Sequence, residues 1–164
     1  MPKRPLVCDT TVLLYLGRID CIDLLPALFS QLYVPDVVML ELDMGRLLRP
    51  DTVDPRDFDW ITPITVAQET VDALPPNRLG AGERAVIAYA HSQQGCLAGL
   101  DDLQARHLAE SLGLEVAGTP GILLRARQSN LLPSVRSLID ALIAQGFRLD
   151  AELYQDILVL AGEA

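Results

Sequence analysis

Five acidic residues of this chain stand where a carboxylate is costly to bury without a partner. Asp9 directly follows the apolar run 6–8, and Asp101 and Asp102 directly follow the apolar run 96–100. Short apolar runs of this kind are typical of buried parallel strands. Ligands of parallel α/β sheets bind at the carboxyl ends of the strands. We therefore expect these acids to lie close together if the two strands are neighbours.

Two glutamates add to this set from expected helices. Glu41 follows Val37 and Val38 at helical spacing and interrupts an apolar stripe. Glu83 stands at the head of the stretch 80–90, GAGERAVIAYA, which is apolar almost all round from its sixth residue. Each glutamate either faces water at the mouth of its helix or meets other groups inside the fold.

Together these positions predict an acidic cluster with a specific chemistry. Carboxylates placed this close repel one another, so the cluster requires a cation or a bound proton. Mg²⁺ and Mn²⁺ prefer oxygen ligands and keep water molecules for chemistry. The expected chemistry is phosphoryl transfer or phosphodiester hydrolysis at the residues Asp9, Glu41, Glu83 and Asp101.

Each position also has a structural interpretation. Glu83 would suit the positive end of a helix dipole, and Asp101 or Asp102 would suit a helix N-cap. Asp102 has Arg106 as a partner one turn later, and Glu41 would suit a partly exposed face. Asp9 has the fewest structural alternatives, because an acid that closes a buried first strand has little to do beyond capping. The metal-site hypothesis rests on the set and on no single position.

The surrounding elements predict an α/β fold in one domain, residues 1–164. Expected strands alternate with expected helices, which favours a parallel sheet covered on both faces. The stretch 49–59, rich in Pro and Asp, is expected to be an exposed loop. The expected strands are 6–8, 32–34 and 96–100, with weaker candidates at 60–61 and 115–117. The expected helices are about 11–17, 21–30, 36–48, 80–94, 102–112, 119–128, 133–145 and 150–161.

Composition narrows the functional classes. The formal net charge is −9, which counts against indiscriminate binding to a phosphate backbone. The three cysteines are widely spaced, form neither a zinc pattern nor a disulfide framework, and fit a reducing compartment. No run approaches the roughly 18 apolar residues of a membrane span. We expect a cytoplasmic protein without a membrane segment.

The ordered set of these motifs resembles the PIN-domain superfamily. The matching stretches, in chain order, are Val7-Cys8-Asp9-Thr10-Thr11, Val34-Pro35-Asp36-Val37-Val38 with Glu41-Leu42, Gly82-Glu83, Leu100-Asp101-Asp102 with Ala105-Arg106, the run 112–126 and the closing residues 161–163. More narrowly, the chain is similar to the PIN-like, VapC-like toxins of bacterial and archaeal toxin–antitoxin pairs. Each motif is weak alone, and the ordered set covers nearly the whole chain.

The resemblance implies a three-layer α/β/α sandwich with a central, mostly parallel sheet. It also implies a ribonuclease site that depends on Mg²⁺ or Mn²⁺ and uses three or four carboxylates. Carried over by position, the catalytic and metal-binding residues are Asp9, Glu41, Glu83 and Asp101, with Asp102 as a substitute or supporting ligand. Many PIN domains have an aspartate at the third acidic position, where this chain has Glu83.

The resemblance further implies substrate and partner contacts. Thr10 or Thr11 takes the hydroxyl position after the first aspartate, and RNA is the implied substrate. Toxin-like relatives imply a homodimer and an antitoxin peptide laid over the acidic crevice. The basic residues expected to contact RNA phosphates are Arg84 and Arg106, followed by Arg78, Arg125 and Arg127.

Two other functional classes remain open at this point. A phosphoacceptor domain also places an aspartate at a strand end. A receiver needs a later lysine, but the only lysine is Lys3, and a dehalogenase needs an acid where Thr11 stands. The stronger alternative is a binding module with this fold, whose metal site is weak or inactive and which works through protein association.

Overall fold

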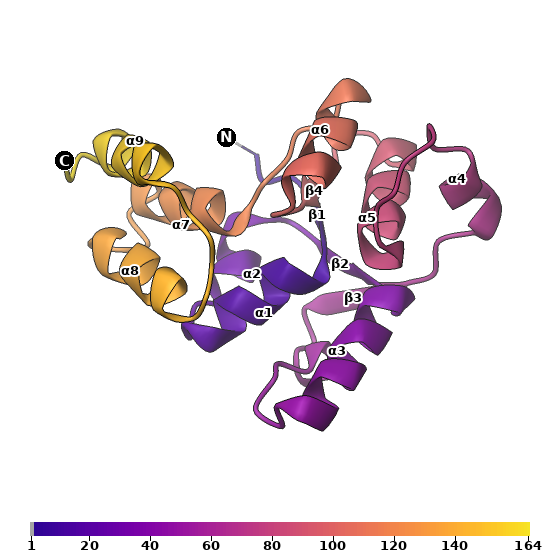
Figure 1. Cartoon of the computed structure of the whole chain (residues 1–164), viewed down its shortest axis with the longest axis horizontal. Coiled ribbons are helices and arrows are strands. Elements are labelled where there is room, and N and C mark those ends of the chain that lie inside the picture. Colours follow the sequence, from indigo (N-terminus) through magenta and orange to yellow (C-terminus); the bar gives the residue numbers. More distant parts are fainter. Residues whose placement is uncertain (1) are drawn as a thin grey trace.

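A computed structural model of the chain describes residues 2–164. Its centre is a four-stranded sheet in the order β3-β2-β1-β4, with all neighbouring strands parallel. Helices cover both faces of the sheet, so the predicted three-layer α/β/α sandwich is confirmed (Figure 1). The strands are β1 (Leu6–Cys8), β2 (Leu32–Pro35), β3 (Ile61–Ile64) and β4 (Leu97–Gly99).

The helices follow the strands in the alternation that the sequence predicts. In the part of the chain that is described, no helix has both the length and the apolar character needed to cross a membrane. The helical elements are α1 (Thr10–Arg18), α2 (Leu24–Leu28), α3 (Asp36–Leu48), the 3₁₀ turn η1 (Pro55–Asp57), α4 (Gln68–Asp72), α5 (Ala81–Ser92), α6 (Leu103–Ser111), α7 (Thr119–Gln128), α8 (Arg136–Ala144) and α9 (Ala151–Ala161).

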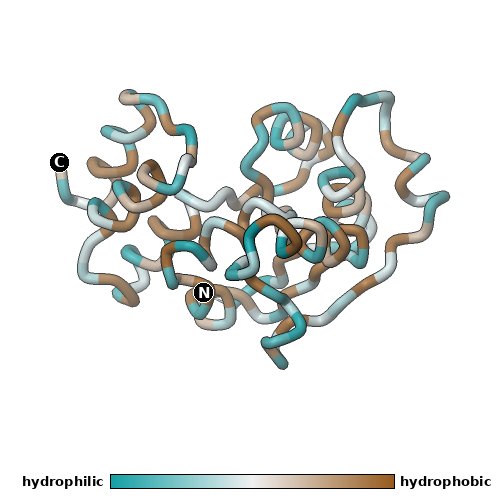
Figure 2. Tube along the Cα trace, turned by 60° about the horizontal axis from the view of Figure 1, so that its bottom comes forward, coloured by the Kyte–Doolittle hydropathy of each residue, from teal (hydrophilic) through white to brown (hydrophobic). Residues whose placement is uncertain are grey.

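Strand β1 separates two hydrophobic cores because successive side chains of a strand point to opposite faces. Leu6 and Cys8 join the larger core, which is built with α1, α2, α3, α7, α8 and α9. Val7 joins the smaller core, which is built with α5 and α6. Hydrophobic and hydrophilic residues alternate along the helices (Figure 2), as expected for helices with one buried face.

The strand order creates a switch point between β1 and β4. The chain leaves β1 towards β2 on one side, whereas β3 connects through α4 and α5 to β4 on the other side. In open α/β sheets, ligands bind at the carboxyl ends of the strands beside such a switch point. Asp9 begins the segment after β1, and Asp101 lies two residues beyond the end of β4.

Several boundaries differ from the sequence-based expectations. The weak strand candidate 115–117 is reduced to one parallel bridge between Ala98 and Val116. The helix expected over 21–30 forms only as Leu24–Leu28. The short helix α4 was not expected, because Gln68–Asp72 carries no buried residue and hence no apolar stripe.

The expectation of an exposed loop over 49–59 is partly wrong. Thr52 and Pro55 are buried in this segment, and the Asp54 side chain accepts a hydrogen bond from the backbone N–H of Arg56 at the start of η1. Arg46 on α3 also donates to the carbonyl oxygen of Val53 at 3.0 Å. The bond from Arg46 holds the segment against α3.

Candidate metal centre

Strands β1 and β4 bring Asp9 and Asp101 to the same edge of the sheet. Cys8 pairs with Gly99 in register, and the backbone N–H of Asp9 donates to the carbonyl oxygen of Gly99 at 3.0 Å. Asp9 occupies the N-cap position of α1, yet its side chain accepts no capping hydrogen bond. The carboxylate is only 4% exposed, so this acid is buried for a reason other than capping.

Glu41 reaches the same place from α3. Its Oε2 accepts a hydrogen bond from the Thr10 hydroxyl, and its Oε1 accepts one from the backbone N–H of Gly82 at 3.2 Å. A Cβ atom placed on Gly82 would lie 2.8 Å from Glu41 Oε1 and 2.9 Å from Asp9 Oδ1. Both carboxylates therefore lie against Gly82, where the Cβ atom of any other residue would collide with them.

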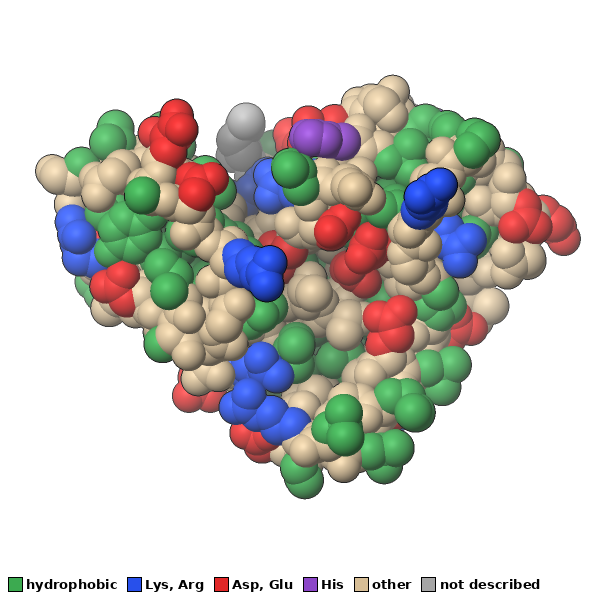
Figure 3. Space-filling view, in the orientation of Figure 1, with side chains coloured by type: hydrophobic (Ala, Val, Ile, Leu, Met, Phe, Trp, Pro, Cys, Tyr) green, Lys and Arg blue, Asp and Glu red, His purple; other side chains and the backbone are tan. Residues whose placement is uncertain are grey.

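Glu83 and Asp102 lie at the outer side of this group. Asp102 is exposed, and its Oδ2 accepts a hydrogen bond from the backbone N–H of Ala105 at 2.9 Å, which makes it the N-cap of α6. Glu83 is half-buried, and burial, followed by the charges of Asp102 and Glu41, raises the pKa of its carboxyl group. Figure 3 shows acidic side chains gathered in the middle of this face.

The electrostatics of Asp9 set it apart from an ordinary surface acid. Burial raises the pKa of Asp9 from 3.8 to about 7, and the charges of Glu83, Glu41 and Asp101 act in the same direction. Only a backbone hydrogen bond from Thr10 opposes them. A group of like charges with so little compensation favours either a proton or a cation between the carboxylates.

Asp101 is held more firmly than the other acids. The backbone N–H of Thr119 donates to Asp101 Oδ1 at 2.6 Å, and the Thr119 hydroxyl donates to Asp101 Oδ2 at 2.7 Å. Burial raises the pKa of Asp101, whereas hydrogen bonds from Thr119 and Thr11 and the charge of Arg106 lower it. Thr11 carries the other candidate hydroxyl; its buried Oγ1 faces Asp101 and helps to lower the pKa of that carboxyl group.

Three further residues border the cluster and were not predicted from the sequence: Gly82, Gly118 and Thr119. The signals were present as Gly-Glu at 82–83 and Gly-Thr at 118–119, each at the start of an expected helix. A Cβ atom on Gly118 would lie 3.1 Å from Asp101 Oδ1 and 2.6 Å from Arg106 Nη1. Both glycines therefore border carboxylates of the cluster, which a pattern search for acidic residues does not reveal.

The basic residues expected to contact RNA fall into two groups. Arg106 Nη1 lies beside Gly118 near Asp101, and in the described chain the Arg106 side chain forms no ion pair. Arg84 follows Glu83 on α5 and is half-buried, and its Nε lacks a hydrogen-bond partner among the described residues. Arg78 is exposed in the segment before α5. Among the described residues, none of these three arginines forms an ion pair, so all three remain candidates for contact with RNA.

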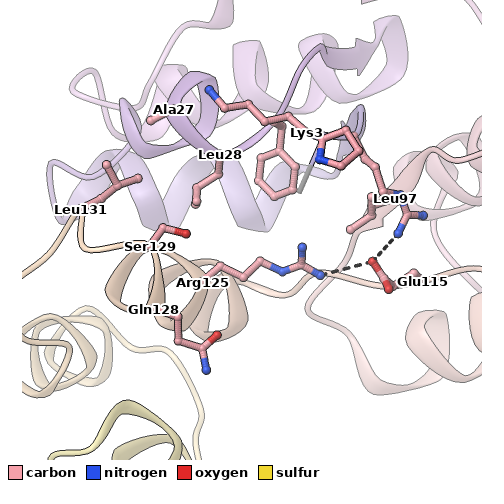
Figure 4. A pocket seen from close by; sticks show the side chains of 12 residues that line it. Lys3, Ala27, Leu28, Leu97, Glu115, Arg125, Gln128, Ser129 and Leu131 are labelled. Carbon is pink, nitrogen blue, oxygen red and sulfur yellow. Dashed lines mark hydrogen bonds and ion pairs between the residues drawn. The ribbon is translucent and has the colours of Figure 1, made fainter.

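Arg125 and Arg127 have other contacts. Arg125 lines a cavity of about 550 Å³, where Glu115 Oε2 pairs with Arg4 at 2.8 Å and with Arg125 at 3.4 Å (Figure 4). Arg127 Nε lies 3.8 Å from Glu163 Oε2. Both arginines are thus already engaged by carboxylates outside the acidic cluster.

The donor chemistry of the cluster fits a hard divalent cation. Asp9 and Glu41 converge at Gly82, and every candidate ligand is a carboxylate oxygen, the type that Mg²⁺ and Mn²⁺ prefer. Over residues 2–164, no three acidic, histidine or cysteine side chains are close enough to hold one ion as they stand.

Comparison with known protein families identifies the class of protein. The profile of the family DUF3368, described as a PIN domain, matches residues 5–163. The chain therefore belongs to the PIN-domain superfamily, whose members typically use divalent metal ions and share a nuclease fold. A search among curated proteins gave no match.

Proposed function

We propose that this protein is a Mg²⁺- or Mn²⁺-dependent endoribonuclease, built as one PIN-like domain. The observation that carries the proposal is the convergence of Asp9 and Glu41 on Gly82, with Asp101 and Glu83 close enough to raise the pKa of Asp9. Such an arrangement is unfavourable for folding alone and favourable for binding a divalent cation. Membership in a nuclease superfamily supports the same conclusion.

Each residue of the cluster has a distinct role in this proposal. Asp9, Glu41, Glu83 and Asp101 would hold the metal, and a divalent ion in such a site supplies a nucleophile by lowering the pKa of water. Thr10 orients Glu41 through its hydroxyl group. Asp101, rather than the capping residue Asp102, is the fourth carboxylate of the site.

RNA would bind through the cations beside the cluster. The Arg106 guanidinium group lies next to Asp101 without an ion pair among the described residues, so it is available for a phosphate oxygen. Arg84 lies on the same helix as Glu83 and is the second candidate. Thr11 would supply a hydroxyl group on the protein side of the site.

An RNA cleavage assay tests the enzymatic proposal. Structured and single-stranded RNA are incubated with the wild type and with Asp9→Asn in Mg²⁺, Mn²⁺ or EDTA. Asp156→Asn on α9 is the matched control, because Asp156 is exposed and lies outside the cluster. We expect cleavage by the wild type and the control only with metal, and none by Asp9→Asn. Cleavage that persists in EDTA, or in Asp9→Asn, would contradict the proposal.

We further propose that the protein is the toxin half of a toxin–antitoxin pair, acting in the cytoplasm as a homodimer. An exposed apolar row on α3 supports a protein-binding role. Leu40, Met44, Leu47 and Leu48 recur at helical spacing, and their exposed fractions run from 63% to 91%. Apolar side chains gather over α3 in Figure 3. Four exposed apolar side chains in one row differ from singly scattered ones, and they support an interaction surface on α3.

The partner proposal is tested by the oligomeric state. Sedimentation of the wild type is compared with that of Leu47→Gln/Leu48→Gln, and with that of Leu153→Gln/Leu160→Gln on α9 as the control pair. We expect a wild-type dimer that dissociates only in the α3 variant. A monomeric wild type, or a dimer that survives the α3 change, would contradict a dimer formed through α3.

The same apolar row favours a second candidate function. A PIN-like binding module with a weak or inactive metal site would need this surface and would not need the acidic cluster. The two candidates differ in one measurable property, because a binding module retains partner binding and shows no metal-dependent cleavage with any RNA. The cleavage assay above therefore separates them.

A further inference from the structure

The first residue of α7 donates hydrogen bonds to both carboxylate oxygens of Asp101. Thr119 is the first residue of α7 and is completely buried. Its backbone N–H donates to Asp101 Oδ1 at 2.6 Å, and its hydroxyl donates to Asp101 Oδ2 at 2.7 Å. Two short bonds to the two oxygens of one carboxylate fix the rotation of that group. Among residues 2–164, no other acid of the cluster is held on both oxygens by one residue.

The backbone before Thr119 is tied to the sheet. The N–H of Ala117 donates to the carbonyl oxygen of Ala98 at 2.9 Å, and the N–H of Leu100 donates to the carbonyl oxygen of Ala117 at 3.3 Å. The segment that leads into Thr119 is therefore hydrogen-bonded to strand β4 and to Leu100, the residue before Asp101. The pair forms a small rigid unit, which suits a residue that must orient a ligand.

Gly118 makes this close approach possible. A Cβ atom on Gly118 would lie 3.1 Å from Asp101 Oδ1 and 3.2 Å from the carbonyl oxygen of Leu100. A larger residue would push the carboxylate away from the start of α7. The Gly-Thr pair at 118–119 thus fits Asp101 in both shape and hydrogen bonding.

We propose that Thr119 is a positioning residue that orients Asp101 towards the acidic cluster. The proposal rests on the proposed metal centre, since it assigns Thr119 a role in that centre. Residues that hydrogen-bond to metal-binding carboxylates orient them, and their loss typically weakens metal binding about 10- to 100-fold. The backbone N–H of residue 119 is kept in the valine and serine variants, so the test removes the hydroxyl group.

A purely structural role would behave differently. If Asp101 served only to cap the start of α7, removal of the Thr119 hydroxyl would lower stability and leave metal affinity unchanged. If Thr119 positions Asp101 for the metal, the affinity falls even where the protein stays folded. Affinity and stability must therefore be measured side by side.

The experiment is a calorimetric titration of Mn²⁺ into the wild type, Thr119→Val and Thr119→Ser, with unfolding midpoints recorded in EDTA. Valine keeps the shape and loses the hydroxyl, whereas serine keeps the hydroxyl. Thr52→Val is the matched control, because Thr52 is also buried but lies in the segment between α3 and η1. Gly118→Ala perturbs Asp101 without touching the hydroxyl, and serves if Thr119→Val fails to fold.

We expect Mn²⁺ affinity to fall about 10-fold in Thr119→Val and Gly118→Ala, and to return to within about 2-fold of wild type in Thr119→Ser. Thr52→Val should bind Mn²⁺ as the wild type does. Wild-type affinity in a folded Thr119→Val would overturn the positioning role and leave the metal centre intact. A wild type that binds no Mn²⁺ would overturn the metal centre and, with it, this role.

Discussion

Two groups of acidic residues in this protein differ in what surrounds them. Asp43 and Asp54 face Arg46 and Arg56. The Arg56 guanidinium group donates to Asp43 Oδ1 at 2.7 Å and to Oδ2 at 2.9 Å, and Arg46 also bonds Asp43. Asp54 accepts from Arg56 at 3.1 Å. Hydrogen bonding to Arg56 lowers the pKa of Asp43.

The second group has the opposite arrangement. Asp9 is buried among Glu41, Glu83 and Asp101, and its pKa rises to about 7. Within residues 2–164, none of these four acids forms an ion pair with a basic side chain. Asp43 and Asp54 are thus matched with cations of the chain, whereas the proposed function leaves the four acids of the cluster for a cation from solution. The two groups therefore differ in charge balance, and an uncompensated group of acids is the one expected at a functional site.

The largest expected effect is a gain in stability on neutralising Asp9. The carboxyl pKa is 3.8 in the unfolded chain and about 7 in the folded protein, so the folded state binds more protons between these values. The contribution of Asp9 to stability is therefore fully present below pH 4 and is lost as the pH rises through 7. We expect Asp9→Asn to be more stable than the wild type in EDTA at pH 8, by up to about 4 kcal/mol. Urea unfolding at pH 8 and pH 4.5 measures this difference, which should shrink at the lower pH.

The matched variant in the other group should change stability in the opposite direction. Because the pKa of Asp43 is lowered, its pairing stabilises the protein above the unfolded pKa and is lost on acidification. Asp43→Asn should therefore lower the urea midpoint at pH 8. Two variants that both destabilise the protein at pH 8 would erase the distinction between the two groups.

A smaller effect is expected from filling the space beside the carboxylates. Gly82→Ala adds a Cβ atom 2.8 Å from Glu41 Oε1 and 2.9 Å from Asp9 Oδ1, so the side chains must shift. Calorimetry should show Mn²⁺ affinity reduced about 10- to 100-fold, with the helix kept because alanine is a good helix former. Gly45→Ala is the control, since its nearest neighbour is Thr52 Cγ2 at 3.8 Å. Equal Mn²⁺ affinity in both variants would show that the site lies elsewhere.

The smallest effect on Mn²⁺ binding is expected from replacing Asp102, which lies beside Asp101 but caps α6. Its side chain caps α6 through the backbone N–H of Ala105. Asp102→Ala should cost about 1 kcal/mol of stability, the usual value of an N-cap, and should leave Mn²⁺ binding within about 3-fold of wild type. Thermal unfolding and calorimetry on the same sample measure both. A large loss of affinity with no loss of stability would make Asp102 the ligand instead of Asp101.

Much of the fold could be predicted from the sequence, because the apolar runs and helical stripes report burial directly. Helices 36–48 and 119–128 were predicted to the residue. Strand β1 and its partner β4 were expected from short apolar runs, and their adjacency was the condition under which Asp9 and Asp101 would meet. The parallel register confirms that condition.

Features that depend on long-range contacts could not be predicted. The loop 49–59 was expected to be free, since its pairing of Asp54 with arginines is visible only in three dimensions. Along α9, Leu153, Ile157 and Leu160 recur at helical spacing, yet only Ile157 is buried, which the spacing alone does not indicate. Thr119 lies 18 residues from Asp101, and no local pattern links the two.

The most direct test of the central claim is a calorimetric titration of Mn²⁺ at pH 7.5 into the wild type, Asp9→Asn, Glu83→Gln and the exposed control Asp156→Asn. The claim is that the unpaired acids at the carboxyl end of the sheet bind a divalent cation. We expect binding in the wild type and the control, and none in Asp9→Asn and Glu83→Gln, with all four proteins folded by circular dichroism. Mn²⁺ affinity unchanged in both cluster variants would contradict the claim.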